Sequence, residues 1–281
     1  MNIFYIDGEF APEDRAVISV NDLGLLRGYG VFDFLRTYNR KPFYLKEHIE
    51  RFECSAKLIG LSLPCTKKDI FDIVNETLAK NENLEEANIR ILLTGGMSTD
   101  SITPLNKPRL IVMVTSATIF SEQLYKNGVA IITTHDERYI PGSKSINYIP
   151  GILALNRANQ QDAIESVYID RLGRVLEGTT SNLFAFIGNK LVTPGISILP
   201  GITRQVVLKL AEKEFDIEIR DVYKDEIRIM DEVFITSSNK EIMPVVRVDE
   251  VVISNGKPSE QTWRIMKMFE QYTSEYGKQT V

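Results

Sequence analysis

The chain has 281 residues, enough for two domains of ordinary size, and its 43% hydrophobic and 25% charged residues are typical of a globular protein. Its formal net charge of −5 argues against a general affinity for nucleic acid or for an anionic membrane, because both need a basic face. Two cysteines and two histidines are too few to predict a disulfide scaffold or a zinc site, so no metal is expected.

Residues 1–8 have the pattern of a strand that enters a turn, not of a basic region followed by a long apolar run, so they do not predict a signal peptide. No apolar stretch of the sequence approaches the roughly 18 residues that a membrane helix needs. We therefore expect a cytoplasmic protein that does not bind membranes and in which Cys54 and Cys65 are reduced thiols.

The first part of the chain predicts an α+β domain. Residues 31–38 are rich in β-forming side chains and partly alternate, which predicts a strand. Residues 46–60 and 67–80 carry apolar side chains at helical spacing, so each predicts an amphipathic helix. Two further strands are predicted at 89–94 and 109–114, with a polar loop rich in Gly, Ser and Pro between them.

Residues 118–123 have no strong pattern and are the predicted linker between an N-terminal domain, 1–117, and a C-terminal domain, 124–281. The C-terminal part predicts strands and helices in alternation, which makes it the larger, strand-rich α/β domain. Its predicted elements are strands at 128–134, 167–170 and 183–187, helices at 150–163 and from about 202, and a terminal helix at 259–276 that contains Trp263 and packs on this domain.

One lysine lies in a constrained connection. Lys144 follows the turn Pro141-Gly142-Ser143, and Ser145-Ile146-Asn147-Tyr148 leads from it into the predicted helix. Glu177 follows 33 residues later and precedes Gly178-Thr179-Thr180-Ser181-Asn182-Leu183-Phe184. A lysine can form a Schiff base with an aldehyde cofactor, and a carboxylate beside a pyridine nitrogen keeps that nitrogen protonated. Taken singly, each would be interpreted as a surface charge.

A third segment, Leu199–Val207, has the features of a phosphate site. Gly201 precedes the predicted helix, so the backbone N–H groups of Ile202 and Thr203 and the helix dipole can bind an anion. The Thr203 hydroxyl adds a further donor. A lysine, a carboxylate and a phosphate site in this order are much harder to obtain by chance than any one of them.

Together these segments resemble the fold-type IV pyridoxal-phosphate enzymes, which include branched-chain aminotransferases, D-amino-acid aminotransferases and aminodeoxychorismate lyases. The resemblance extends from about residue 4 to about residue 248 and includes Leu26–Asp33, Glu47–Arg51 and Asp231–Phe234. It implies the two-domain α+β and α/β fold of that group and the cofactor pyridoxal 5′-phosphate. The motifs are specific to the superfamily and only weakly specific to its members.

The resemblance also assigns roles to individual residues. It implies that Lys144 anchors the cofactor and moves a proton, that the Glu177 carboxylate meets the pyridine nitrogen, and that the Tyr148 hydroxyl donates to the phenolate oxygen. It implies that Arg51 and Ser238 bind the phosphate together with Ile202 and Thr203. A solvated helix arginine and a buried core tyrosine are the alternatives for Arg51 and Tyr148. Because Arg51 lies in the N-terminal domain and the others in the C-terminal domain, the cofactor is expected at the domain junction.

The substrate region departs from the pattern of the best-known relatives. D-amino-acid enzymes carry an arginine and a histidine, two residues apart, in the loop that corresponds to 95–104, and this chain has neither there. Branched-chain enzymes have glycine where Phe34 stands, although Phe32, Arg36 and Tyr148 fit their pattern. The run at 179–181 is closer to the serine-rich form of D-amino-acid enzymes. The side chain and chirality of the substrate therefore stay open.

Substrate residues are predicted by type. A substrate carboxylate needs a cation or converging N–H groups, and surface or structural charges are the alternative for each cation. The candidate cations are Arg27, Arg36 and Lys240. Two further candidates for contact with the substrate are Phe32 and Asn239. The candidates for an apolar pocket or, equally, for the core are Phe32, Phe34, Met97 and Met243.

The leading hypothesis is an aminotransferase that moves an amino group between an amino acid, L-branched-chain or D-, and a 2-oxo acid through a Schiff base of Lys144. The alternative is a lyase of the aminodeoxychorismate type, which releases pyruvate and shares residues 27–32 with the aminotransferases. A binding protein without activity is disfavoured by the presence of Lys144 and Glu177. We also expect a homodimer in which residues 27–30 and 95–104 complete the neighbouring subunit's pocket.

Overall fold

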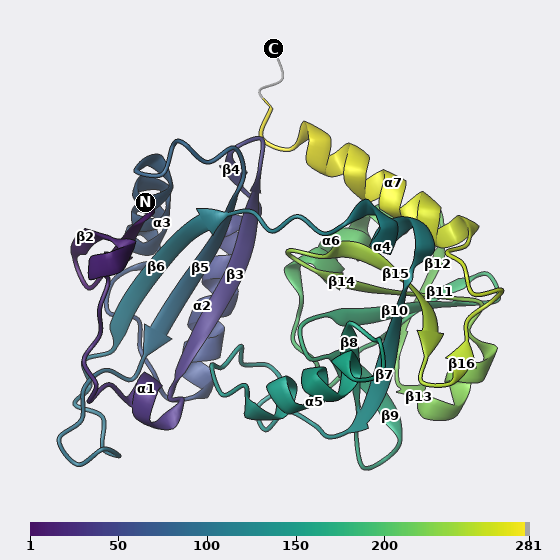
Figure 1. Cartoon of the computed structure of the whole chain (residues 1–281), viewed down its shortest axis with the longest axis horizontal. Helices are drawn as coiled ribbons and strands as arrows, with labels where there is room; N and C mark the ends of the chain where they lie inside the picture. Colours follow the sequence, from purple (N-terminus) through teal and green to yellow (C-terminus); the bar gives the residue numbers. More distant parts are fainter. Residues whose placement is uncertain (279–281) are drawn as a thin grey trace. The chain divides into compact units, whose positions relative to one another are not determined.

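The computed structural model describes residues 1–278, in which the chain divides into two compact units (Figure 1). The division differs from the predicted domains because the chain returns twice to the first unit. The first unit comprises Met1–Thr118, Gly142–Asn147 and residues 275–278, and the second comprises Ile119–Pro141 and Tyr148–Ser274.

The first unit is built on a six-stranded antiparallel sheet. Its elements are β1 Ile3–Ile6, β2 Glu9–Pro12, a 3₁₀ turn Glu13–Arg15, α1 Leu23–Arg27, β3 Gly30–Tyr38, β4 Lys41–Pro42, α2 Leu45–Leu58, α3 Lys67–Ala79, β5 Ala87–Thr94 and β6 Arg109–Ser116. The strand order is β2-β1-β6-β5-β3-β4, and α2 and α3 pack on one face of the sheet (Figure 1).

β3 shows how the sequence sets the two faces of this sheet. Side chains alternate along a strand, and here Val31 and Leu35 are fully buried against α2, while Phe32 and Phe34 on the opposite face are half-buried. The apolar side of α2, which includes Phe52, completes the core between helix and sheet. The one charged residue on the inward face of β3 is Asp33, and it needs buried partners.

The second unit contains a ten-stranded sheet in the order β12-β11-β10-β14-β15-β7-β8-β9-β13, with β16 paired to β15. The strands β11 and β12, β15 and β7, and β7 and β8 are parallel neighbours, and the other pairs are antiparallel. The bounds are α4 Glu122–Asn127, β7 Val129–His135, α5 Ile149–Asn159, β8 Glu165–Ile169, β9 Arg174–Gly178, β10 Asn182–Ile187, β11 Lys190–Pro194, α6 Ile202–Ala211, β12 Asp216–Arg220, β13 Val222–Tyr223, a 3₁₀ helix Lys224–Ile229, β14 Glu232–Ser237, β15 Glu241–Val248, β16 Val251–Val252 and α7 Glu260–Glu275.

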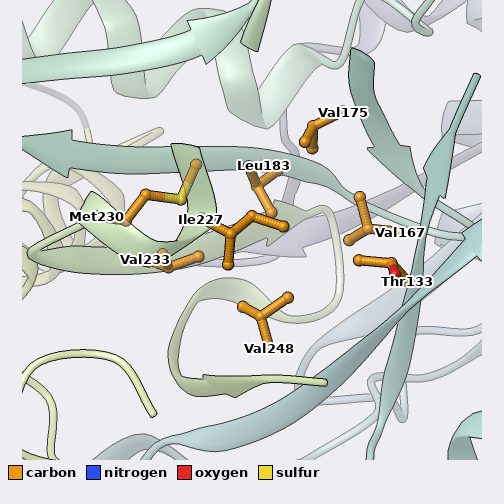
Figure 2. Close-up of a pocket in the computed structure, with 8 residues that line it drawn as sticks. All are labelled: Thr133, Val167, Val175, Leu183, Ile227, Met230, Val233 and Val248. Atoms are coloured by element: carbon orange, nitrogen blue, oxygen red, sulfur yellow. The ribbon is translucent and has the colours of Figure 1, made fainter. Parts of the chain in front are cut away.

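The core of the second unit contains a void of about 10 Å³ (Figure 2). The void is far too small for a cofactor or a substrate, and the one polar side chain on its wall, Thr133, already donates to Asp249 at 2.7 Å. It is a packing defect and not a binding site. The residues around it are Thr133, Val167, Val175, Leu183, Ile227, Met230, Val233 and Val248.

The helices and strands that the sequence predicted are present, with ends within four residues of the predicted ones, and several further strands, among them β9, β11, β14 and β15, were not predicted. The predicted helix at 150–163 ends earlier, at Asn159, and α4 begins at Glu122 inside the predicted linker. The terminal helix is present as α7, and its first turn bonds to the second unit, since Glu232 accepts from the Thr262 N–H at 2.7 Å. Within residues 1–278, no helix combines the length and the apolar character needed to cross a bilayer.

Candidate active site

Lys144 lies on a short segment that pairs with the edge of β3 in the antiparallel sense. The Phe32 N–H donates to the Lys144 carbonyl at 2.8 Å, and the Ile146 N–H donates to the Gly30 carbonyl at 3.0 Å. The segment therefore has the backbone partners of an added strand, and main-chain atoms set the position of the lysine.

α2 also holds this segment. The Ser143 hydroxyl donates to the Ser55 carbonyl at 3.0 Å, and the Lys144 N–H donates to the Ser55 hydroxyl at 3.1 Å. The Lys144 ammonium lies 4.7 Å from the centroid of the Phe32 ring, close enough for the ring face to attract the cation. These partners all belong to the first unit, so the expectation that Lys144 belongs to the second domain was wrong for this segment.

α2 carries a buried polar stripe beside its apolar one. His48, Arg51 and Ser55 are three and four residues apart and share one face of the helix. Arg51 and His48 are the partners of Asp33, the buried charged residue of β3. The Asp33 carboxylate accepts from Arg51 Nε at 2.9 Å and from Arg51 Nη2 at 2.8 Å, and it lies 2.7 Å from His48 Nδ1.

Burial sets the ionisation of this cluster. Burial alone raises the pKa of the Asp33 carboxyl, but the Arg51 guanidinium and the His48 ring outweigh it and hold that pKa well below its usual range. Burial lowers the pKa of His48 more than the Asp33 carboxylate raises it. At neutral pH the cluster is an ion pair of Arg51 and Asp33 with a neutral imidazole, whose Nδ1 must carry the proton because a carboxylate only accepts.

The outer face of β3 brings a cation and two rings together near Lys144. Arg90 on β5 stands opposite Phe34 in the strand register. Its guanidinium carbon lies 5.8 Å from the Phe32 ring centroid and 5.7 Å from that of Phe34. The ammonium of Lys144 contacts the same Phe32 ring. One face of the first unit therefore offers an amine, an apolar surface and an exposed guanidinium.

Glu177 is a buried carboxylate at the end of β9, with 4% of its surface exposed. Its Oε1 accepts from Arg138 Nη1 at 3.0 Å, and its Oε2 accepts from the Leu199 N–H at 2.9 Å. The Asn182 amide donates to the Leu199 carbonyl at 3.0 Å and to Glu177 Oε2 at 3.4 Å. Asn182 thus joins the loop before α6 to the Glu177 segment.

Tyr148 stands directly before α5, and its hydroxyl donates to the Thr179 carbonyl at 2.6 Å. Burial raises the pKa of Tyr148 well above its usual range, even though nearby Arg138 lowers it. The phenol therefore stays protonated at neutral pH and acts as a hydrogen-bond donor. Its acceptor, Thr179, belongs to the loop that follows Glu177.

α6 begins at Ile202 directly after Gly201, as the sequence predicted. The N–H groups of Ile202 and Thr203 lie in the first turn of this ten-residue helix and therefore lack acceptors within it. Gly201 has no side chain that could cap them. A Cβ atom at Gly201 would lie 1.9 Å from Asn182 Oδ1. Only glycine therefore permits the Asn182 bonds and this helix start together, and the result is an N-terminus suited to an anion.

The cations predicted to bind a substrate carboxylate lie in three different settings. Arg27 is exposed at the end of α1 and donates to a backbone carbonyl of its own turn at 2.8 Å. The Arg36 guanidinium carbon lies 4.8 Å from the centroid of the Tyr38 ring. Lys240 is buried, and its ammonium donates to the Glu165 carboxylate. This internal pairing argues against Lys240 as a substrate-binding residue.

The remaining substrate and phosphate candidates also differ in their burial. Ser238 and Asn239 lie half-buried in the turn between β14 and β15, where Asn239 Oδ1 accepts from a neighbouring hydroxyl at 3.0 Å. Met243 is fully buried in the core of the second unit and is a packing residue. Met97 is 45% exposed in the loop after β5, so a ligand can still reach it.

Three charged residues in these sites were not singled out from the sequence. Arg138 pairs with Glu177 across 39 residues, and Glu165 collects donors up to 75 residues away, so no local pattern reveals either partner. Arg90 did leave a signal. It is the one charge in an otherwise mostly apolar predicted strand, where a solvent-facing position and a functional one look alike in sequence.

Comparison with known proteins agrees with this geometry. The fold resembles the branched-chain amino acid aminotransferase of Escherichia coli, with a TM-score of 0.92 at 24% identity over 99% of this chain and 97% of that one. It also resembles the T.th. branched-chain amino acid aminotransferase with pyridoxamine 5′-phosphate, with a TM-score of 0.91 at 26% identity over 97% and 94% of the two chains. The architecture is that of fold-type IV aminotransferases.

The sequence relatives carry the same signal. The chain is 36% identical to a putative branched-chain-amino-acid aminotransferase of Methanocaldococcus jannaschii over 97% of both chains, and 32% identical to a D-alanine aminotransferase of Staphylococcus epidermidis over 99% of this chain and all of that one. Residues 30–248 match the family described as amino-transferase class IV. The chain belongs to this family of pyridoxal-phosphate enzymes, and the comparisons favour an aminotransferase over the lyase alternative.

Proposed function

We propose that this aminotransferase binds pyridoxal 5′-phosphate and takes L-amino acids with apolar side chains as amino donors. Lys144 would anchor the cofactor, Glu177 and Tyr148 would hold its ring, and Arg51 with Thr203 would bind its phosphate. The observation that carries the proposal is the placement of Lys144 by main-chain pairing on β3, with its ammonium over the Phe32 ring.

The donor set fits this cofactor. At the start of α6, the N–H groups of Ile202 and Thr203 have no acceptors within the helix, and the Thr203 hydroxyl is a further donor. Together they would bind the phosphate, and Ser238 would add another donor. The Glu177 carboxylate is buried and held by Arg138, so its orientation is fixed, as a group that must meet one ring atom requires. Arg51 presents a planar guanidinium, a group suited to phosphate oxygens.

When bound, pyridoxal phosphate supplies an electron-withdrawing ring that accepts electron density from the substrate α-carbon. Glu177 would hold the proton on the ring nitrogen through its carboxylate. Lys144 Nζ would remove the proton from the substrate α-carbon and return it to the reacting carbon of the cofactor. Tyr148, protonated at neutral pH, has one hydroxyl proton, which it would turn from the Thr179 carbonyl to the ring oxygen when the cofactor binds.

The outer face of β3 supports a substrate class. Phe32 and Phe34 give an apolar surface beside Lys144 that suits an aliphatic side chain, and the exposed guanidinium of Arg90 suits a second carboxylate. We therefore propose a dicarboxylic 2-oxo acid as amino acceptor. The arginine and histidine that trap D-substrates in relatives are absent from the loop at 95–104, which favours L-substrates.

The test is a panel of L- and D-amino acids with 2-oxoglutarate or pyruvate as acceptor, scored by the amino acid formed. We expect turnover with L-leucine, L-isoleucine or L-valine and 2-oxoglutarate. Arg90→Met should raise the KM for 2-oxoglutarate at least tenfold and leave the KM for a monocarboxylic 2-oxo acid nearly unchanged. Exclusive use of D-amino acids would overturn the substrate proposal, and release of pyruvate from aminodeoxychorismate would restore the lyase.

We also propose a homodimer. On α5, next to the lysine segment in sequence, Ile149, Ile152 and Leu153 are each more than half exposed, which is unusual for large apolar side chains on one short helix. In the first unit Leu25 and Ile102 are likewise exposed, near Arg27 and within the 95–104 loop. Equilibrium sedimentation should give twice the 31.9 kDa chain mass. A monomer with full activity would contradict the shared pocket.

A further inference from the structure

Glu165 is a fully buried carboxylate that accepts hydrogen bonds from the loop after Glu177. It stands at the start of β8, and its two oxygens accept from the backbone N–H and the hydroxyl of both Thr179 and Thr180 and from the Ser181 hydroxyl. The Thr179 hydroxyl lies at 2.5 Å, that of Thr180 at 2.6 Å and that of Ser181 at 3.0 Å. Through these hydrogen bonds the Glu165 carboxylate fixes the conformation of all three loop residues.

The same carboxylate reaches a second loop through Lys240. The Lys240 ammonium donates to Glu165 Oε2 at 3.3 Å and to the Thr180 hydroxyl at 2.5 Å, and only 8% of this lysine is exposed. Lys240 ends the turn 237–240, in which its N–H donates to the Ser237 hydroxyl at 3.2 Å. One buried ion pair therefore ties the loop 179–181 to the turn that contains Ser238, within the second unit.

The surroundings are fitted to this arrangement. A Cβ atom at Gly178 would lie 2.3 Å from the Ser181 hydroxyl and 3.0 Å from the Glu165 carboxyl carbon, so glycine alone permits the loop to close. Burial raises the pKa of Glu165, but the Lys240 ammonium and the threonine hydroxyls outweigh it and keep the carboxyl ionised. A buried ion pair is an inefficient way to gain stability, because an apolar pair of similar volume often does as well.

We propose that Glu165 and Lys240 are positioning residues for the cofactor. They fix the Thr179 carbonyl that accepts from the Tyr148 hydroxyl, and they tie that loop to the turn of Ser238. The proposal rests on the proposed function, in which Tyr148 and Ser238 touch the cofactor. Neither Glu165 nor Lys240 would touch it.

The test is the Kd of the apoprotein for pyridoxal 5′-phosphate, measured by quenching of the fluorescence of Trp263, the single tryptophan, or by absorbance. Lys240→Met should raise the Kd about tenfold, the equivalent of one lost hydrogen bond to a charged group. Thr180→Val removes the hydroxyl that contacts both Lys240 and Glu165, keeps the other hydrogen bonds between Glu165 and the loop, and should also raise the Kd. Lys209→Met, at an exposed lysine of α6, is the matched control and should leave the Kd unchanged.

Two measurements distinguish a positioning role for Glu165 and Lys240 from a merely structural one. Urea denaturation of each apoprotein reports the stability of the fold, and a shift there with an unchanged Kd for both variants would overturn the proposal. Tyr148→Phe should also weaken binding, and adding Lys240→Met to it should cost less than tenfold, because part of the effect of Lys240 passes through the hydroxyl that Tyr148→Phe removes. Fully additive losses would overturn the route through Tyr148.

Failure of the wild-type protein to bind pyridoxal phosphate would instead refute the proposed function. If Lys240→Met does not fold, Thr180→Val alone decides the matter, since it exchanges one hydroxyl for a methyl group and leaves the ion pair in place. An unchanged Kd in a folded Thr180→Val protein would overturn the positioning role.

Discussion

Arg51→Ala should destabilise the protein as well as weaken cofactor binding, and the two effects can be separated. The Asp33 carboxylate is 0% exposed, and two nitrogens of Arg51 donate to it, at 2.9 and 2.8 Å. Removal of one partner from a buried ion pair leaves an uncompensated charge and costs about 3–5 kcal/mol. This is a large part of the roughly 5–15 kcal/mol by which a domain is stable.

The assay is urea denaturation of the apoprotein, in which the midpoint falls with the free energy of unfolding. The double variant Arg51→Ala/Asp33→Asn removes the stranded charge and leaves a side chain that can still bond His48, so it should recover most of the lost stability. If Arg51→Ala unfolds at the wild-type urea concentration, or if the double variant is as unstable as the single one, the assignment of the buried charge pair is wrong.

Cofactor affinity then tests the role of Arg51 by itself. If the guanidinium binds phosphate, the affinity for pyridoxal phosphate should stay weaker by about 1–3 kcal/mol in the double variant, although its fold is restored. If the affinity returns together with stability, Arg51 acts only through Asp33, and its placement at the phosphate is refuted.

Three further predictions concern the same sites. Lys144→Ala should abolish turnover while the fold persists, because the segment pairs through main-chain atoms; multiple turnovers without an added amine would contradict the assignment. Glu177→Gln keeps an acceptor for the Leu199 N–H but removes the charge, so kcat should fall at least tenfold with some cofactor retained; an unchanged rate means that another group holds the ring proton. Because burial lowers the pKa of His48, the unfolded chain takes up a proton near pH 6.5 that the native protein does not, and stability should fall as the pH drops below about 6.5. Denaturation at pH 7.5 and 5.5 should show a smaller decline for His48→Gln, and an equal decline would exclude this source.

The elements that position the site were predictable because their patterns are local. The alternation of β3 and the apolar spacing of α2 placed both within a few residues. The segments around Lys144 and Glu177 could be recognised because each contains its chemistry within a few consecutive residues. Gly201 likewise marked the start of α6.

The partners of these groups could not be predicted, because each comes from a distant part of the chain. Lys144 looked like part of the second domain, since the sequence gives no sign that its backbone pairs with a strand more than a hundred residues earlier. Lys240 looked available to substrate until Glu165 was found beside it. Charge and spacing do not distinguish a buried ion pair from a solvated one, as the cluster around Asp33 also shows.

The return of the chain to the first unit has a consequence for how the enzyme is made. Residues 1–118 contain the sheet and its helices, but the edge of β3 is completed by residues 142–147, and Asn39 bonds the Tyr276 carbonyl at 3.0 Å. During synthesis the first unit emerges with that edge unpaired, and an unpaired edge is a template for association with other chains. The lysine segment therefore both positions the Lys144 ammonium and closes the edge of β3, so we expect the nascent chain to be most prone to aggregation before this segment has docked.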